Sequence, residues 1–284
     1  MNDAAPIPDQ AVCIGVFDSG VGGLSVLRSL RGLMPAARFL YVADSGHAPY
    51  GERDEVYVVE RARAITAHLL REGAQLVVVA CNTATAAAVQ ALRQQWPGIG
   101  FVGVEPGLKP AIALSARRRI GVMATRGTLQ SDKFRRLVAA HADGVELLLQ
   151  PCDGLARALE DGDAAAPQVH ALIERHTAPL RAAEVDTVVL GCTHYPFAAA
   201  QIAEALGPAV TLVDTAEAVA LQARRLAAGL RPCGAGPALR LWSSGDPAAL
   251  QRVARRWLDW PGEAQALPPA SSWCPGSESN RYGP

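Results

Sequence analysis

Hydrophobic residues along the chain form short runs that alternate with longer amphipathic stretches. The run at 76–80 (LVVVA) is apolar throughout and is followed by polar residues, as in the buried strands of parallel sheets. The pattern predicts strands at 12–17, 39–43, 76–80, 101–104, 119–123, 145–149, 187–190, 210–213 and 239–243. It predicts helices at 23–33, 53–72, 83–95, 108–115, 127–141, 155–159, 167–182, 198–206, 215–229 and 246–258. The alternation indicates an α/β protein with mainly parallel sheets covered by helices on both faces.

A weak internal repeat divides this pattern. Three strand ends recur in the same order at almost the same spacing: 77–83 resembles 188–194, 14–16 resembles 120–122, and 104–106 resembles 213–215. Collinear matches of this kind favour two similar, pseudo-symmetric α/β lobes. The strand and helix after residue 239 exceed the repeat, and we expect them to return to the first lobe.

The two ends of the chain carry other signals. The first ten residues have neither a basic nor an apolar segment, so we expect no secretory signal. The apolar runs are too short to span a bilayer. From Pro261 onward, Pro, Gly and Ser occur without periodicity, which predicts a disordered tail at 261–284. We expect Trp273 and Cys274 in this tail to have no functional role.

Composition narrows the possible partners. The chain has 284 residues, with 27 Lys and Arg against 27 Asp and Glu. A neutral chain lacks the overall basic field of a nucleic-acid binder, so we expect no nucleic-acid partner. The six cysteines are scattered without a Cys-x-x-Cys motif, which favours a reducing, cytoplasmic location. The six histidines show no paired ligand spacing, so no metal site is predicted.

Two cysteines stand out by position. Cys81 and Cys192 occupy equivalent places in the repeat, each after a strand and before a helix. Ligands gather at the carboxyl ends of parallel strands, and a helix N-terminus there favours a thiolate. Core packing, a disulfide or a single nucleophile would each explain cysteine at these sites. Two facing acid/base groups suit a different task, because removing a proton from one face and returning one to the other inverts a stereocentre.

Polar residues near these cysteines could assist them. His194 follows Cys192 by two residues, and an extended backbone would point both side chains the same way. An imidazole there could lower the pKa of the thiol or shuttle its proton. Asp18, Glu105 and Asp214 end predicted strands, although Asp also commonly caps helices. Asn82, Thr83 and Thr193 are good capping residues as well, and helix N-termini bind carboxylates.

Cofactor signatures are weak by comparison. The glycine-rich segment at 19–23, with Asp44 ending the next strand, suggests dinucleotide binding. However, Ser25 stands where the third glycine is required, and Asp18 would bring negative charge near a pyrophosphate. A pyridoxal-phosphate enzyme needs a Schiff-base lysine, and neither Lys109, before Pro110, nor Lys133, in a charged helix, is attractive. Chemistry without a cofactor is favoured.

Several motifs together resemble a known family. They are 14–24 (IGVFDSGVGGL), 43–44 (AD) with 49–51 (PYG), 80–84 (ACNTA), 103–106 (GVEP), 121–125 (GVMAT) and 190–196 (LGCTHYP). Over residues 12–258 the chain resembles the glutamate racemases of the cofactor-independent aspartate/glutamate racemase superfamily. The two cysteine motifs carry most of this specificity.

The resemblance implies an architecture and an activity. Residues 12–105 plus 215–260 would form one lobe and 106–214 the other, with the active site in the cleft between them. The enzyme would interconvert L- and D-glutamate without a cofactor, supply D-glutamate for peptidoglycan, and form a homodimer. A racemase of a related acidic amino acid such as aspartate is the nearest alternative. A nicotinamide-dependent oxidoreductase and a two-lobed ligand-binding protein with inert cysteines are more distant ones.

The resemblance also implies residue roles. Cys81 would take the proton from the D-isomer and Cys192 from the L-isomer, with support from Asp18 and His194. Glu160 aligns with an auxiliary glutamate of the family, although the sequence around it differs. The positions that match substrate contacts are Asp18, Ser19, Tyr50, Gly51, Asn82, Thr83, Thr193 and His194.

Overall fold

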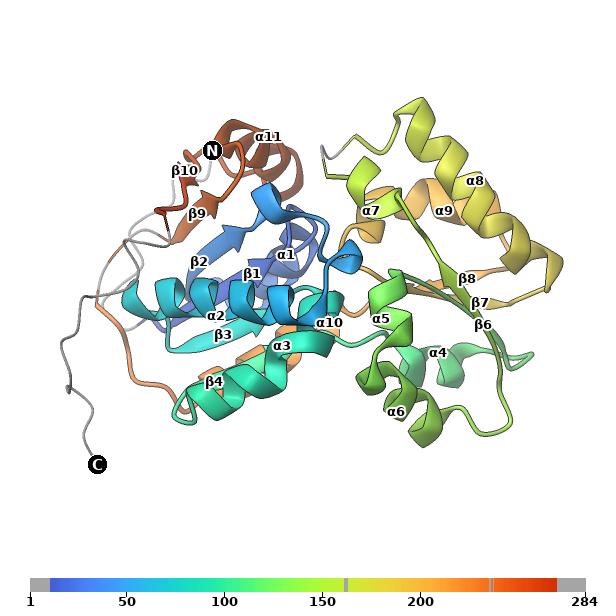
Figure 1. The fold of residues 1–284 in the computed structure, drawn as a ribbon, viewed down its shortest axis with the longest axis horizontal. Coiled ribbons are helices and arrows are strands. Elements are labelled where there is room, and N and C mark those ends of the chain that lie inside the picture. Colours follow the sequence, from blue (N-terminus) through green and yellow to red (C-terminus); the bar gives the residue numbers. More distant parts are fainter. Residues whose placement is uncertain (1–10, 161–162, 235, 237, 270–284) are drawn as a thin grey trace.

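The computed structural model describes residues 11–160, 163–234, 236 and 238–269, which fold into two lobes placed side by side (Figure 1). The first lobe contains a six-stranded sheet of order β10-β9-β2-β1-β3-β4 and the helices packed on it. The second contains a four-stranded sheet of order β6-β5-β7-β8. Every strand pairing is parallel, as expected for continuous apolar strands.

The strands follow the predicted pattern closely. They are β1 (Cys13–Asp18), β2 (Arg38–Ala43), β3 (Leu76–Val79), β4 (Gly100–Gly103), β5 (Arg119–Ala124), β6 (Glu146–Pro151), β7 (Thr187–Gly191), β8 (Thr211–Val213), β9 (Leu239–Ser243) and β10 (Gln265–Ala266). The order β2-β1-β3-β4 recurs as β6-β5-β7-β8. The two lobes therefore share one topology, and the pseudo-symmetry predicted from the repeat is confirmed.

The helices connect these strands. They are α1 (Leu24–Leu33), α2 (Glu55–Arg71), α3 (Asn82–Gln95), α4 (Leu108–Leu114), α5 (Arg126–Gln130), α6 (Asp132–His141), α7 (Leu155–Ala158), α8 (Pro167–Ala182), α9 (Ala199–Leu206), α10 (Ala216–Ala227) and α11 (Pro247–Leu258). Three short 3-10 helices were not predicted: η1 (Ser45–His47), η2 (Tyr50–Glu52) and η3 (Tyr195–Ala198). Within the described ranges, no helix is long and apolar enough to cross a membrane.

One predicted helix, 127–141, is divided in two. Ser131 has an extended backbone, with ψ of 147°, and its side chain accepts a hydrogen bond from the Phe134 N–H. The serine thus ends α5 and caps α6. A capping side chain competes with the helical backbone carbonyls for backbone N–H groups. The hydrophobic period of the sequence gives no sign of this competition, so the pattern predicted one continuous helix.

The central strands of both sheets are buried on both faces. In β1, Ile14 belongs to the core shared with α1, α10 and α11, whereas Phe17 belongs to the core shared with α2 and α3. In β7, Val188 packs with α8 and α9, and Val189 packs with α4, α5 and α6. Alternate side chains of an apolar strand therefore pack against the helices on opposite faces of the sheet. Polar side chains that could form a site lie instead at the carboxyl ends of the strands.

The segment after the repeat returns to the first sheet, where β9 pairs with β2. The predicted disordered tail is partly ordered: Gln265 and Ala266 pair with β9, and the Leu267 N–H donates to the Ser243 carbonyl at 2.7 Å. The prediction was wrong for this stretch, because an edge strand can be held by backbone hydrogen bonds without any hydrophobic period. Residues 270–284 lie outside the described part of the chain.

Candidate active site

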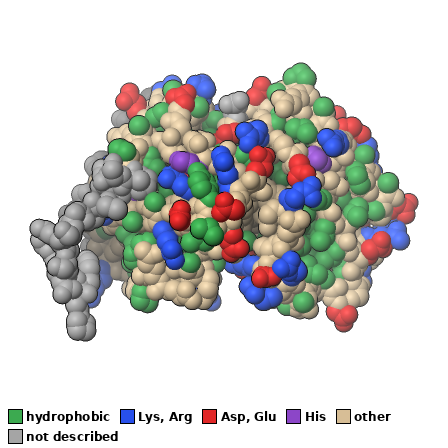
Figure 2. Space-filling view, in the orientation of Figure 1, with side chains coloured by type: hydrophobic (Ala, Val, Ile, Leu, Met, Phe, Trp, Pro, Cys, Tyr) green, Lys and Arg blue, Asp and Glu red, His purple; other side chains and the backbone are tan. Residues whose placement is uncertain are grey.

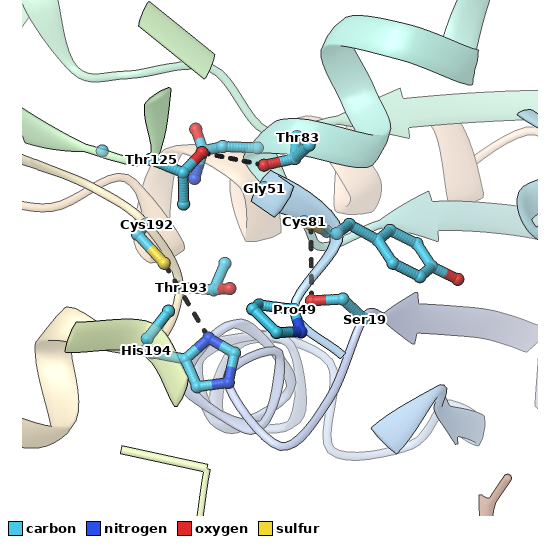
Figure 3. Close-up of a pocket in the computed structure, with 13 residues that line it drawn as sticks. Ser19, Pro49, Gly51, Cys81, Thr83, Thr125, Cys192, Thr193 and His194 are labelled. Atoms are coloured by element: carbon cyan, nitrogen blue, oxygen red, sulfur yellow. Dashed lines mark hydrogen bonds between the residues drawn. The ribbon is translucent and has the colours of Figure 1, made fainter. Parts of the chain in front are cut away.

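A narrow cavity lies between the lobes, at the carboxyl ends of strands from both sheets (Figure 3). Its walls combine two thiols, several hydroxyls, one amide and one imidazole. The lining residues are Ser19, Pro49, Tyr50, Gly51, Cys81, Asn82, Thr83, Thr125, Ala156, Gly191, Cys192, Thr193 and His194. Of the eleven residues proposed from the sequence, nine line this cavity. Asp18 and Glu160 do not line it, but they form hydrogen bonds with Thr193 and His194, which do.

Cys81 enters the cavity from the first lobe. It precedes α3 with an extended backbone, and its sulfur accepts a hydrogen bond from the Ala84 N–H at 3.4 Å. The Cys81 thiol lies 3.8 Å from the Ser19 hydroxyl. Burial raises the pKa of Cys81 well above its usual value, and the nearby Asp18 charge raises it further, whereas the Ala84 N–H opposes the rise. The helix N-terminus thus offsets part of the cost of a buried thiolate.

Cys192 enters from the second lobe with His194 beside it. The Cys192 sulfur lies 3.8 Å from Nδ1 of His194. Their closeness was predicted, but its expected cause was wrong. The backbone at His194 is helical, with φ of −77° and ψ of −29°, and the Tyr195 N–H donates to the Cys192 carbonyl at 3.1 Å. A tight turn, rather than an extended strand, brings the two side chains together.

Glu160 holds the other side of the imidazole. Its Oε2 lies 2.6 Å from Nε2 of His194. The same carboxylate accepts hydrogen bonds from the Ser45 hydroxyl at 2.6 Å and from the Val21 N–H at 3.1 and 3.2 Å. Burial alone would lower the pKa of His194, but its hydrogen bonds to Cys192 and Glu160, with the Glu160 charge, raise it well above the usual value.

Asp18 connects the lobes beneath the cavity. The side chain is fully buried and accepts hydrogen bonds from the Ser19 hydroxyl at 3.0 Å and the Thr193 hydroxyl at 2.7 Å. Burial raises the pKa of Asp18, while the His194 charge and the Thr193 hydrogen bond lower it. Asp18 therefore sets the position and electrostatics of the hydroxyls that line the cavity.

The glycine-rich segment before α1 is packed against these groups. A Cβ atom at Gly20 would lie 2.1 Å from Oε2 of Glu160, and one at Gly22 would lie 2.4 Å from Nδ1 of His194. The glycines are thus required for close approach of second-lobe side chains. The space where a dinucleotide pyrophosphate would lie holds Glu160 and His194, so this segment gives no support to the nicotinamide alternative.

Asp44 also has a structural role in place of the ribose contact that a dinucleotide site would need. Its buried carboxylate forms hydrogen bonds with Arg61 at 2.7 and 2.9 Å and accepts one from the Tyr50 hydroxyl at 2.5 Å. This ion pair holds the segment that carries Tyr50 and Gly51 into the cavity. A Cβ at Gly51 would lie 2.8 Å from Thr125, so the segment is in close contact with the second lobe.

Sequence reasoning missed two polar residues at the site, one that lines the cavity and one that holds Glu160. Thr125 follows β5 as Cys192 follows β7, and its hydroxyl lies 3.0 Å from that of Thr83 across the lobe boundary. Its position at a strand end was the available signal. Ser45 gave none, since its partner Glu160 is distant in the chain. Glu105 and Asp214, also at strand ends, do not line the cavity; within the described residues Glu105 pairs with Lys133 at 2.9 Å.

Charged side chains border the cavity. Glu52 of the first lobe pairs with Arg157 of the second at 2.8 Å, and Arg126 pairs with Asp153 at 2.5 Å. These four residues line a hollow that adjoins the cavity at Gly51. Figure 2 shows Lys, Arg, Asp and Glu side chains gathered along the lobe boundary. Within the described residues, no group of three or more His, Cys, Asp or Glu side chains is placed to hold a metal ion.

Figure 3 shows Cys192 with His194 on one side of the cavity and Cys81 with Ser19 on the other. The charge of Cys192 contributes to the raised pKa of Cys81, so the two thiols lie close enough to interact. Two thiols of this kind can act on opposite faces of one bound carbon atom.

Comparison with known proteins decides the family. Residues 24–223 match the Asp/Glu/hydantoin racemase family. A glutamate racemase of Methylococcus capsulatus is 49% identical over 260 residues, which cover 90% of this chain and 94% of that protein. One of Ectopseudomonas mendocina is 48% identical over 242 residues, covering 84% and 92%. The chain belongs to the Asp/Glu/hydantoin racemase family. It is therefore an amino-acid racemase.

The fold of this racemase is also similar to that of a solved glutamate racemase structure. The crystal structure of Escherichia coli glutamate racemase, in complex with L-glutamate and the activator UDP-MurNAc-ala, is 33% identical. The alignment covers 90% of this chain and 97% of that one, with a TM-score of 0.79. The two-lobed α/β architecture is thus shared over nearly the whole length of both proteins.

Proposed function

We propose that this racemase interconverts L- and D-glutamate by proton transfer between Cys81 and Cys192, without a cofactor. The observation that carries the proposal is the placement of two buried thiols, from equivalent strand ends of the two lobes, on opposite sides of one cavity. One thiolate would take the Cα proton while the opposite thiol delivers a proton to the other face. The Cα–H bond breaks on one side and a new one forms on the other.

The surrounding groups suit the binding of an amino acid. Asn82 Oδ1 is buried and has no hydrogen-bond partner within the described residues, so it can accept from the substrate ammonium group. The hydroxyls of Ser19, Thr83 and Thr193 can donate to carboxylates. Hydrogen bonds to the α-carboxylate would stabilise the negative charge that develops as the Cα proton leaves. Burial of the cavity excludes water and strengthens these interactions.

The two cysteines would be supported differently. For Cys192 we propose that protonated His194, held by Glu160, stabilises the thiolate that takes the proton from L-glutamate. For Cys81, which takes the proton from D-glutamate, the α3 N-terminus and Ser19 serve this purpose. Asp18 acts as a positioning residue, because it orients Ser19 and Thr193 through hydrogen bonds. The different support of the two thiols suits a reaction in which the L- and D-isomers lose their protons from opposite faces of Cα.

Glutamate is the proposed substrate because the similar proteins of Ectopseudomonas mendocina and Methylococcus capsulatus are glutamate racemases. We further propose that the enzyme supplies D-glutamate for peptidoglycan and that it acts as a homodimer.

We also propose that residues 12–105 with 215–260 form the first lobe and that residues 106–214 form the second. These boundaries are supported by the sheets, since the strands between residues 119 and 213 form the second sheet and the other strands form the first.

The test is to incubate the purified protein with L-glutamate in D₂O and to follow circular dichroism and the α-proton NMR signal. We expect optical activity to vanish as deuterium enters the α position, with no added cofactor and after dialysis against a chelator. L-Aspartate is the comparison substrate. Faster exchange with L-aspartate would overturn the choice of glutamate, and activity that requires pyridoxal phosphate or a metal would overturn the mechanism.

A further inference from the structure

A second pair of thiols lies at the opposite edge of the first sheet from the cavity. Cys13 begins β1, and Cys233 lies in the connection between α10 and β9. The Cys233 N–H and the Cys233 thiol both donate to the carbonyl of Ala11, each at 2.8 Å. Ala11 precedes Cys13 by two residues, and both cysteine side chains belong to the same hydrophobic cluster. The contacts to the Ala11 carbonyl thus hold the Cys233 side chain beside the start of β1.

The two thiols have different surroundings. Cys233 is partly exposed, whereas Cys13 is only 1% exposed. Arg38 pairs with Cys13 across β1 and β2, and its Nη1 lies 3.6 Å from the Cys233 sulfur. Burial raises the pKa of Cys13 to about 12, with a further contribution from Cys233. Cys233 is thus the accessible thiol of the pair, and Cys13 is a neutral neighbour.

We infer that Cys13 and Cys233 form a redox-sensitive site, oxidised to a disulfide by peroxides. The Cys233 thiolate attacks one oxygen of hydrogen peroxide, the O–O bond breaks, and a sulfenic acid forms as hydroxide leaves and is protonated to water. The Cys13 sulfur then attacks the Cys233 sulfur, and the sulfenic oxygen leaves as a second water with the Cys13 proton. Two thiols and one peroxide thus give one disulfide and two waters, and an external dithiol reverses the change.

The position of the pair determines what its oxidation would do. Cys13 lies at the amino end of β1, while Asp18 and Ser19 lie at the carboxyl end beside the cavity. A bond from Cys13 to Cys233 would close a loop that contains the entire second lobe. Long closed loops restrict the unfolded chain most. Oxidation should therefore raise the melting temperature by several degrees while the racemase keeps its activity.

The test uses the full-length reduced protein with one equivalent of hydrogen peroxide. Free thiols are then alkylated in denaturant, and the peptides are mapped by mass spectrometry. We expect a peptide pair joining Cys13 to Cys233, an intact mass lower by two hydrogen atoms, and reversal by dithiothreitol. In Cys233→Ala this linkage should be absent and Cys13 should remain alkylatable. In the matched control Cys274→Ala, the linkage should form as in the wild type.

Two outcomes would overturn the inference. One is alkylation of both Cys13 and Cys233 after peroxide treatment. The other is a linkage of Cys233 to a cysteine other than Cys13. Because the peptide map is made on the wild-type chain, neither outcome depends on the folding of a variant. Racemase assays on the oxidised sample test separately whether the enzyme keeps its activity when the disulfide forms. A loss of activity that dithiothreitol restores would contradict the structural role assigned to the bond.

Discussion

The Oε2 atom of Glu160 lies 2.6 Å from Nε2 of His194, although the two residues belong to different segments of the second lobe. The same carboxylate is held from the first lobe by the Ser45 hydroxyl and the Val21 N–H. The charge on the imidazole next to Cys192 therefore depends on groups from both lobes. Full assembly of the cavity and the ionisation of His194 are thus coupled.

Replacement of either proposed base should abolish racemisation. Cys81→Ser and Cys192→Ser should each reduce kcat by at least about 1,000-fold, because a serine hydroxyl is a far weaker acid than a thiol. With β-chloroglutamate, each variant should still eliminate HCl from one enantiomer, since elimination needs one base only. Cys13→Ser is the control, being a buried thiol far from the cavity, and should stay active. Near wild-type racemisation by Cys81→Ser would contradict the two-base mechanism.

His194→Asn should slow the two directions unequally. We expect the initial rate from L-glutamate to fall about 100-fold, because the Cys192 thiolate loses the imidazolium beside it. The rate from D-glutamate should fall less. The two kcat/KM values must stay matched at equilibrium, so the difference should be sought in kcat, from initial rates measured by circular dichroism. Equal slowing in both directions would show that His194 does not act through Cys192 alone.

Glu160→Gln should change the dependence on pH. The carboxylate raises the pKa of His194, so its removal should move the loss of the imidazolium to lower pH and shift the basic limb of kcat from L-glutamate with it. A raised pKa stabilises the fold below the unfolded value of 6.5, and that contribution is lost as pH rises through the folded value. The variant should therefore lose about 2 kcal/mol of unfolding free energy near pH 6, and less at higher pH.

The control for this prediction is Glu105→Gln. Glu105 pairs with Lys133 at 2.9 Å, is half exposed, and does not line the cavity that contains His194. Its replacement should leave the kcat profile in place. If the basic limb moves equally in Glu105→Gln and Glu160→Gln, general electrostatics rather than the Glu160–His194 contact would be responsible.

Asp18→Asn should lower activity without lowering stability at neutral pH. Burial raises the pKa of Asp18, so ionised Asp18 costs folding free energy, and stability is lost as pH rises from below 3.8 through the folded value. At pH 7 the variant should be as stable as the wild type or up to about 2 kcal/mol more stable. As pH falls toward 4, the difference should shrink. Urea unfolding at several pH values measures this, and a clear destabilisation at pH 7 would contradict it.

The activity of the same variant tests the positioning role of Asp18. We expect kcat to fall at least about 100-fold, because Ser19 and Thr193 lose the acceptor that orients both hydroxyls. Unchanged kcat in a folded variant would show that this orientation is not needed.

A methyl group at Gly22 should disrupt the site. The added Cβ would lie 2.4 Å from Nδ1 of His194, so the imidazole must move away from Cys192. We expect Gly22→Ala to lower kcat at least about 100-fold. Gly32→Ala is the matched control. Within the described residues, nothing lies within 4 Å of the added Cβ at this helical position. That variant should keep its activity and gain about 0.5–1 kcal/mol in unfolding free energy.

The amino-acid sequence by itself determined the local architecture and the pair of cysteines. Strand and helix patterns depend on neighbouring residues, so the nine predicted strands were found within a residue or two. The repeat placed Cys81 and Cys192 at equivalent strand ends, and parallel strands always present these ends on one edge. Both inferences need only local periodicity and topology.

Tertiary structure decided everything that depends on distance between remote segments. Glu160 meets His194 because two distant segments of the second lobe pack together, whereas Ser45 meets Glu160 and Thr125 meets Thr83 because the lobes close on one another. The packing of Glu160 and His194 on the glycine segment, and the pairing of residues 265–266 with β9, likewise join separate segments of the chain. Hydrogen bonds and close contacts act over a few ångströms, and a chain pattern carries no measure of such distances between segments far apart in sequence.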